Sequence, residues 1–158
     1  DSEFDQMKRI AGELASNLVE RLSRDCQTTS DTETLTAQLQ QFVRDYSFIQ
    51  YVYVTDVKGH STAIAISDPG DQKGYKAFPI GFDYSNREWF QQPMRTGKLH
   101  IMNVHQSQVT GQLIITVSTV ITDANDEIIG VLGADIQLEE IIRRAESLEA
   151  EEHIGEEE

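Results

Sequence analysis

The sequence has a single cysteine, Cys26, and only three prolines among its 158 residues. One cysteine cannot form an internal disulfide, and it cannot supply a zinc or redox site of the CxxC type. No stretch approaches the ~20 consecutive apolar residues that a membrane-spanning helix needs, and no secretory signal peptide is visible. Because the chain begins with Asp1 rather than Met, we expect it to be a piece of a longer protein.

Basic residues are scarce too, since 13 Lys and Arg stand against 27 Asp and Glu and give a formal net charge of −14. A surface of this charge repels phosphates, so duplex nucleic acid is not an expected partner. Half of the net charge comes from residues 139–158, which hold nine Glu and two Arg. We therefore predict one ordinary acidic domain over residues 1–148, followed by a frayed acidic tail over residues 150–158.

Motifs for catalysis are missing as well. The sequence contains no GxSxG, no Gly-rich phosphate loop and no HExxH, and no nucleophile–base pair can be assembled from it. Two of the four histidines, His100 and His105, lie five residues apart on one predicted strand, so they are expected to point to opposite faces and to share no metal. The sequence therefore indicates neither an enzyme nor a metal or cofactor site.

Two amphipathic helices are predicted within residues 1–46. In the first, apolar residues recur every three or four positions, namely Phe4, Met7, Ala11, Leu14, Leu18 and Leu22. This stripe either packs only on its own domain or also pairs with a second copy, which would give a homodimer through the N-terminal helix. Ser30 and Glu33 form a capping-box pattern that begins the second helix, expected to run to about Tyr46.

From Ile49 onward the apolar period shortens to two, which predicts strands. Five are expected, over residues 49–55, 61–67, 99–106, 112–122 and 127–136. The short turn-like connections make neighbouring strands antiparallel. Ser85 and Glu88 form a second capping-box pattern, so a short helix should begin near Asn86 and end at Gly97. With an exit helix over residues 138–149 after the last strand, the fold class is α+β.

A compact group of polar and aromatic residues begins the predicted short helix. Arg87 offers five fixed donors at a helix start, where the helix dipole adds partial positive charge, so it can receive a carboxylate. Trp89 can supply an apolar wall or a cation–π face. Alternatively, Arg87 pairs with Glu88 or Asp83 at the surface, and Trp89 and Phe90 belong to the core.

Asp135 is the second informative residue, because it ends an apolar strand between Ala134 and Ile136. A carboxylate there is either partnered or costly to bury, so it caps the following helix or meets a cation. On the strand 99–106, Asn103 and His105 share one face. If that face meets the core, they place polar groups in an apolar setting, as in a selective pocket; alternatively this face is exposed to water.

The stretch from Asp83 to about Ile136 resembles the Cache sensor domains, PAS-like extracytoplasmic modules of bacterial and archaeal receptors. An ordered set of short motifs carries the resemblance: Arg87–Phe90, Thr96–Lys98, Val109–Gln112, Ile114–Ser118 and Gly130–Ile136. It implies a single module with a five-stranded antiparallel sheet, residues 49–136, behind a long N-terminal helix. A small ligand would lie between this sheet and residues 68–94.

Some relatives of this kind bind amino acids. The resemblance to them implies that Arg87 and Trp89 would receive the carboxylate of a ligand and that Asp135 would receive its amino group. The predicted ligand site comprises Tyr84, Arg87, Trp89, Phe90, Asn103, His105 and Asp135. Two positions depart from the pattern, since an aromatic hydroxyl is usual where Phe90 stands and a tyrosine where His105 stands. An ordinary α-amino acid is therefore in question, and a different carboxylate, an amine or a modified amino acid remains open.

The function so predicted is that of a ligand-sensing input domain, not an enzyme. The whole protein would be a transmembrane receptor, namely a histidine kinase, a chemoreceptor or a cyclic-dinucleotide enzyme, with this domain in the periplasm. One alternative is a structural dimerisation module with an empty pocket. Another is a cytoplasmic PAS-like sensor, because a receptor leading into a second membrane span should turn apolar after its exit helix, and residues 151–158 do not.

Overall fold

The computed structural model describes residues 2–26, 31–68, 76, 79–107 and 111–157. Two helices come first, α1 (Ser2–Asp25) and α2 (Thr32–Asp45), and a hairpin of β1 (Ile49–Thr55) and β2 (Ser61–Ile66) follows. The rest of the chain forms α4 (Glu88–Thr96), β3 (His100–Gln106), β4 (Leu113–Thr122), β5 (Ile128–Gln137) and α5 (Leu138–Glu157).

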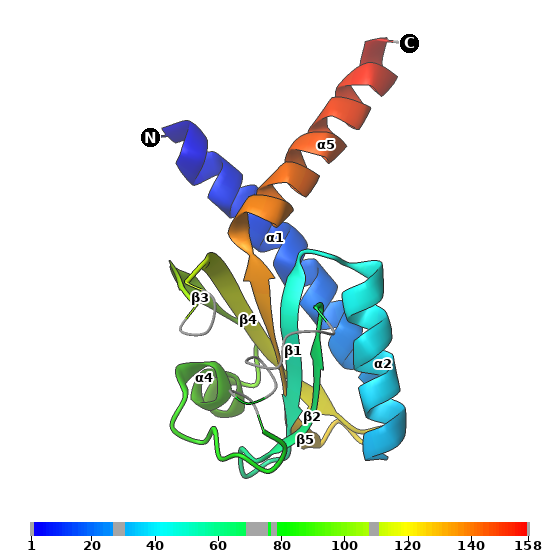
Figure 1. Ribbon diagram of the computed structural model, residues 1–158, viewed down its shortest axis with the longest axis vertical. Coiled ribbons are helices and arrows are strands. Elements are labelled where there is room, and N and C mark those ends of the chain that lie inside the picture. Colours follow the sequence, from blue (N-terminus) through cyan, green and yellow to red (C-terminus); the bar gives the residue numbers. More distant parts are fainter. Residues whose placement is uncertain (1, 27–30, 69–75, 77–78, 108–110, 158) are drawn as a thin grey trace.

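The five strands form one sheet in the order β2-β1-β5-β4-β3, and each neighbouring pair is antiparallel. Helices α1 and α2 cover one face of the sheet, and α4 lies against the other (Figure 1). The predicted α+β class is therefore confirmed, with its five-stranded antiparallel sheet, long N-terminal helix and C-terminal exit helix. The start of α1 and the end of α5 project from the same end of the molecule (Figure 1).

The apolar stripe of α1 packs on the sheet of its own domain. Ala11, Leu18 and Leu22 are at most 7% exposed and belong to a core shared with α2 and the sheet. These residues are therefore already covered within one molecule. A homodimer through this helix stays a prediction, and it would have to use other residues of α1.

Both predicted capping boxes are wrong. The N-cap of α2 is Asp31, whose carboxylate accepts the Thr34 N–H at 3.3 Å, and Ser30 lies outside the described residues. Helix α4 begins at Glu88 with Arg87 at its N-cap. Ser85 lies two residues before this N-cap, in a turn where its N–H donates to the carboxylate of Asp83 at 2.8 Å, so its hydroxyl is not at the cap position.

The exit helix is longer than predicted. The sequence suggested a frayed tail after residue 149, whereas α5 continues to Glu157. The added segment is rich in glutamate and has no proline, and glutamate ranks among the better helix formers, so charge alone does not end the helix. None of the described helices combines the length and the apolar composition needed to cross a bilayer.

Gly130 of β5 leaves no room for a side chain beside β1. A Cβ atom there would lie 2.0 Å from the carbonyl oxygen of Thr55, which is backbone and cannot rotate away. At Gly12, inside α1, a Cβ atom would meet nothing within 4 Å. The two glycines therefore allow one substitution to be compared in a crowded and in an open position.

We expect Gly130→Ala to lower the free energy of unfolding by about 1–3 kcal/mol, because the added methyl overpacks the strand pair. Gly12→Ala should raise it by about 0.5–1 kcal/mol, because alanine loses less backbone entropy in a helix. Urea unfolding followed by circular dichroism measures both. Equal effects of the two substitutions would show that the strand contact does not constrain position 130.

Candidate functional site

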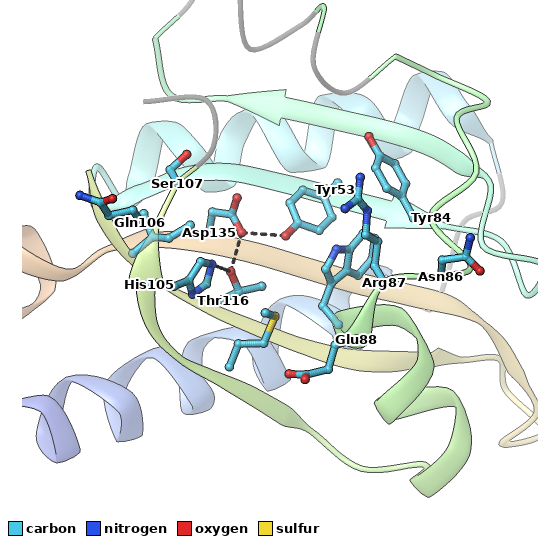
Figure 2. A pocket seen from close by; sticks show the side chains of 13 residues that line it. Tyr53, Tyr84, Asn86, Arg87, Glu88, His105, Gln106, Ser107, Thr116 and Asp135 are labelled. Atoms are coloured by element: carbon cyan, nitrogen blue, oxygen red, sulfur yellow. Dashed lines mark hydrogen bonds between the residues drawn. The ribbon is translucent and has the colours of Figure 1, made fainter. Parts of the chain in front are cut away.

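A cavity of about 590 Å³ lies between the sheet and α4 (Figure 2). Of the seven residues predicted for the site, five line this cavity: Tyr84, Arg87, Trp89, His105 and Asp135. They come from the segment before α4, from α4 itself, and from β3 and β5. Arg87 and Asp135, which are 48 positions apart in the sequence, thus face one cavity.

The other two predicted residues are Phe90 and Asn103. Phe90 does not line the cavity; it is 7% exposed and packs in the core cluster between the sheet and α4. For Phe90 the alternative interpretation, a core side chain, is therefore the right one. Asn103 belongs to β3, but its side chain lies outside the described part of the structure.

A bulge in β3 changes which residues face the cavity. The pairing of β3 with β4 shifts register between Met102 and His105, and both of these residues line the cavity. Val104 packs on the opposite, helix-covered core. His100 also lies toward α4, where its Nε2 is 2.9 Å from Glu88 Oε2. The expectation that His100 and His105 point to opposite faces is therefore wrong, because a bulge resets the alternation of a strand.

Asp135 is held by two hydroxyl groups from neighbouring strands. Tyr53 of β1 donates to Asp135 Oδ1 at 2.7 Å, and Thr116 of β4 donates to the same oxygen at 2.9 Å (Figure 2). Among the described residues, no further hydrogen bond reaches this carboxylate, so Oδ2 can accept one from a ligand. Asp135 therefore does not cap α5, which was the alternative that the sequence left open.

His105 extends this network. Its Nε2 lies 3.4 Å from the Thr116 hydroxyl, which gives its own hydrogen to Asp135. The Thr116 oxygen can therefore only accept from His105, and this assigns the Nε2–H form to the ring. His105 is thus connected through Thr116 to the carboxylate that a cationic ligand group would approach.

Burial sets the protonation of the two central groups. It raises the pKa of Asp135 above its ordinary value, against the hydrogen bonds from Tyr53 and Thr116 and the nearby charge of His105. Burial, together with the charge of Asp135, also raises the pKa of Tyr53 well above its ordinary value. Tyr53 therefore remains a hydrogen-bond donor. Any further donor or cation that a ligand brings would stabilise the ionised form of Asp135.

Tyr53 reaches Asp135 because Gly133 leaves room for its ring. Tyr53 pairs with Gly133 across β1 and β5, and a Cβ atom at Gly133 would lie 2.3 Å from Tyr53 Cε2. The ring also packs against Trp89, with centroids 4.6 Å apart. The sequence interpretation missed Tyr53 and Thr116. A signal for Tyr53 existed in the alternation of β1, which places Tyr51 and Tyr53 on the same face.

Arg87 brings a cation without a counter-ion from the protein. Its two acidic neighbours are engaged elsewhere, since Glu88 contacts His100 and the carboxylate of Asp83 accepts the Ser85 N–H. No salt bridge to Arg87 is found among the described residues. The guanidinium therefore lines the cavity ready for an anionic group. In the part of the chain that the structure describes, no three His, Cys, Asp or Glu lie close enough to hold a metal ion.

Residues 31–143 match the family model described as "Methyl-accepting chemotaxis protein-like, first PDC sensor domain". The chain belongs to this family. The resemblance to Cache sensor domains is thereby confirmed, and the chain is a sensory input domain. That residues 1–148 form a single module stays a prediction.

Solved chemoreceptor structures share the fold of this sensor domain. The ligand-binding domain of Campylobacter jejuni Tlp3 in complex with 4-methylisoleucine has a TM-score of 0.66 at 17% identity, covering 87% of this chain and 56% of that one. The ligand-binding domain of Pseudomonas aeruginosa PctC in complex with GABA has a TM-score of 0.63 at 23% identity, covering 87% and 61%.

A curated relative from Syntrophus aciditrophicus, named Citrate (Re)-synthase, is 36% identical over 146 residues. The match covers 92% of this chain but only 23% of that protein. The chain therefore spans about a quarter of the relative's length, and the enzyme name belongs to that whole protein. The matched residues themselves correspond to the sensor-domain family.

The raised pKa of Asp135 predicts a pH dependence of stability. The folded state binds this proton more tightly than the unfolded chain, where the pKa is near 3.8. The stabilisation is complete below that pH and is lost as the pH rises through the folded-state pKa. Asp135→Asn keeps the acceptor oxygen and cannot ionise, so it should be more stable than the native domain near neutral pH.

Thermal unfolding between pH 3 and pH 8 measures this difference. The gain in stability of Asp135→Asn over the native domain should grow as the pH rises above 3.8. Asp45→Asn, an exposed position on α2, is the control for removing one negative charge. A gain that does not change with pH would contradict an ionisation penalty at Asp135.

Proposed function

We propose that this sensor domain binds a small ligand that carries both a carboxylate and an amino group. The observation behind the proposal is the pairing, in one cavity, of the unpaired guanidinium of Arg87 with the buried carboxylate of Asp135, whose Oδ2 can accept from a ligand. A ligand with both charges satisfies both groups, whereas a ligand with one charge leaves the other to water. Trp89 provides an apolar wall for the ligand's carbon chain.

The related structures support this ligand class. The Tlp3 domain is described in complex with 4-methylisoleucine and the PctC domain with GABA, and both molecules are amino acids. These two ligands place the amino group at different distances from the carboxylate, so the fold accommodates more than one spacing. Because Tyr53 and Thr116 both donate to Oδ1 of Asp135, we propose a ligand whose amino group approaches Oδ2.

We further propose that the domain lies outside the cytoplasm, as the input of a transmembrane chemoreceptor-like protein. Membership in a chemotaxis sensor family supports this location. The start of α1 and the end of α5 leave the domain at the same end, as flanking segments that return to one membrane would require (Figure 1). The partners of the whole protein would be determined by parts of it other than this domain.

A ligand set built on one four-carbon chain tests the charge pairing. GABA carries both charges, butyrate only the carboxylate and butylamine only the amine. If the ligand class is right, GABA binding needs both Arg87 and Asp135. Arg87→Ala leaves a desolvated anion unpaired and should weaken binding by about 2–5 kcal/mol, tens- to thousands-fold. Asp135→Asn should act similarly through the amino group.

Isothermal titration with L-isoleucine and the three four-carbon compounds measures these effects. Arg95→Ala is the matched control, because Arg95 also lies on α4 but its partner is Gln92 and it does not line the cavity. Butyrate should respond only to Arg87, and butylamine only to Asp135. The proposal is contradicted if a bound amino acid tolerates both substitutions, or if the native domain binds butyrate as tightly as GABA.

The link between the pocket and the output runs through β5. Asp135 precedes the first residue of α5, Leu138, by three positions, and the Gln137 N–H donates to the Phe48 carbonyl at 2.9 Å. Inserting one alanine after Gln137 would rotate α5 by about 100° relative to the sheet. We expect ligand affinity to persist and signalling by the whole receptor to change. Loss of affinity in a titration would show that pocket and helix start form one unit.

A further inference from the structure

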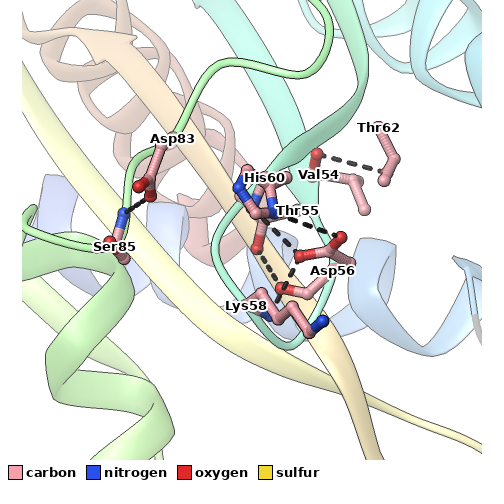
Figure 3. A network of polar contacts seen from close by, with 8 residues as sticks. All are labelled: Val54, Thr55, Asp56, Lys58, His60, Thr62, Asp83 and Ser85. Atoms are coloured by element: carbon pink, nitrogen blue, oxygen red, sulfur yellow. Dashed lines mark hydrogen bonds and ion pairs between the residues drawn. The ribbon is translucent and has the colours of Figure 1, made fainter.

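The segment that carries Tyr84 and Arg87 is attached to the turn between β1 and β2 and to the first residue of β2. Asp83 and Ser85 of this segment lie beside the turn (Figure 3). Three backbone hydrogen bonds make the attachment. The Ser61 N–H donates to the Phe82 carbonyl at 2.9 Å, the Gly81 N–H to the Ser61 carbonyl at 2.7 Å, and the Tyr84 N–H to the Gly59 carbonyl at 2.8 Å. We call residues 81–87 the arm, since they lead from this turn into α4.

The turn that receives the arm is itself held in one shape. Asp56 Oδ1 accepts the N–H groups of Lys58 at 2.9 Å and His60 at 3.0 Å (Figure 3). The Asp56 N–H donates to the His60 carbonyl at 2.9 Å, and Gly59 has a φ of +93°. The position of the arm therefore depends on a turn whose geometry side-chain and backbone bonds both define.

Gly59 leaves no room for a side chain between the turn and the arm. A Cβ atom there would lie 2.9 Å from both the Cα and the N atom of Ser85. Both atoms belong to the backbone, so no side-chain rotation relieves the contact, and the arm itself would have to move. Ser85 follows Tyr84 directly, and the Arg87 N–H donates to the Tyr84 carbonyl at 2.9 Å, so such a shift would reach both cavity-lining residues.

We propose that Gly59 is a positioning residue for the ligand cavity: its missing side chain lets the arm sit close enough to the turn for Tyr84 and Arg87 to face Asp135. That the arm helps to form a ligand site rests on the function proposed above. That a side chain at position 59 would displace the arm does not depend on that function. Tyr84 is buried against Trp89, with ring centroids 5.3 Å apart. Displacement of the arm therefore alters the surroundings of Trp89.

Trp89 provides a readout that needs no ligand, because it is the only tryptophan in the chain. Gly59→Ala should shift its fluorescence emission to longer wavelength and increase its quenching by acrylamide. Gly97→Ala is the matched control, since Gly97 has a φ of +70° but a Cβ atom there meets nothing within 4 Å. Each substitution places alanine at positive φ and should lower the melting temperature by about 2–8 °C.

Only Gly59→Ala is expected to change the emission of Trp89, while far-ultraviolet circular dichroism stays that of the native domain. Emission and quenching identical to those of Gly97→Ala would overturn the proposal. If Gly59→Ala does not fold, Asp56→Ala loosens the same turn without a collision and should shift Trp89 in the same direction. Native emission in folded Asp56→Ala would overturn the proposal as well.

Titration with GABA or L-isoleucine then separates the two proposals. If the native domain binds one of them, its affinity should fall about tenfold or more in Gly59→Ala, the loss of one charge-assisted hydrogen bond. Unchanged affinity would overturn the positioning role. If the native domain binds neither, the proposed function fails, and the shift of Trp89 still supports the positioning of the arm by Gly59.

Discussion

Asp135 lies on β5, the central strand of the sheet, and its carboxylate is buried, so the charge has little water around it. Such a group is tolerated only with hydrogen-bond partners, and Tyr53 and Thr116 supply them from the strands on either side of β5. Tyr53 in turn requires Gly133, because any side chain there would collide with its ring. Three strands and one glycine are thus arranged around a single acidic side chain.

The two faces of the sheet consequently differ in what they pack against and in their polarity. The face under α1 and α2 is a packed apolar core. The face toward α4 combines an aromatic cluster with a cavity lined by polar and charged groups. Because β5 carries Asp135 and continues directly into α5, the proposed ligand would act on the strand that begins the exit helix. It can shift the helix only by its different affinity for the two helix positions.

The opposite wall of the cavity is positioned by a different constraint. Arg87 lies at the start of α4, and its segment is attached by backbone bonds to the turn between β1 and β2. Asp135 and Arg87 are therefore held by separate parts of the chain, the sheet interior and a surface turn. A ligand that touches both would connect these two parts.

The sequence by itself determined the five strands, four of the helices, the fold class and five residues that face the cavity, because apolar periodicity and motif order are local properties. Tertiary structure alone decided the partners of Asp135, since Tyr53 lies 82 positions away in the chain. It also decided the faces of His100 and His105, because the bulge in β3 exists only in the pairing with β4. The capping box at Ser85 failed because the chain forms a turn with Asp83 there, and the helix begins only at Glu88, with Arg87 at its N-cap. Phe90 joined the core because packing, not residue type, decides which aromatic side chain reaches a cavity.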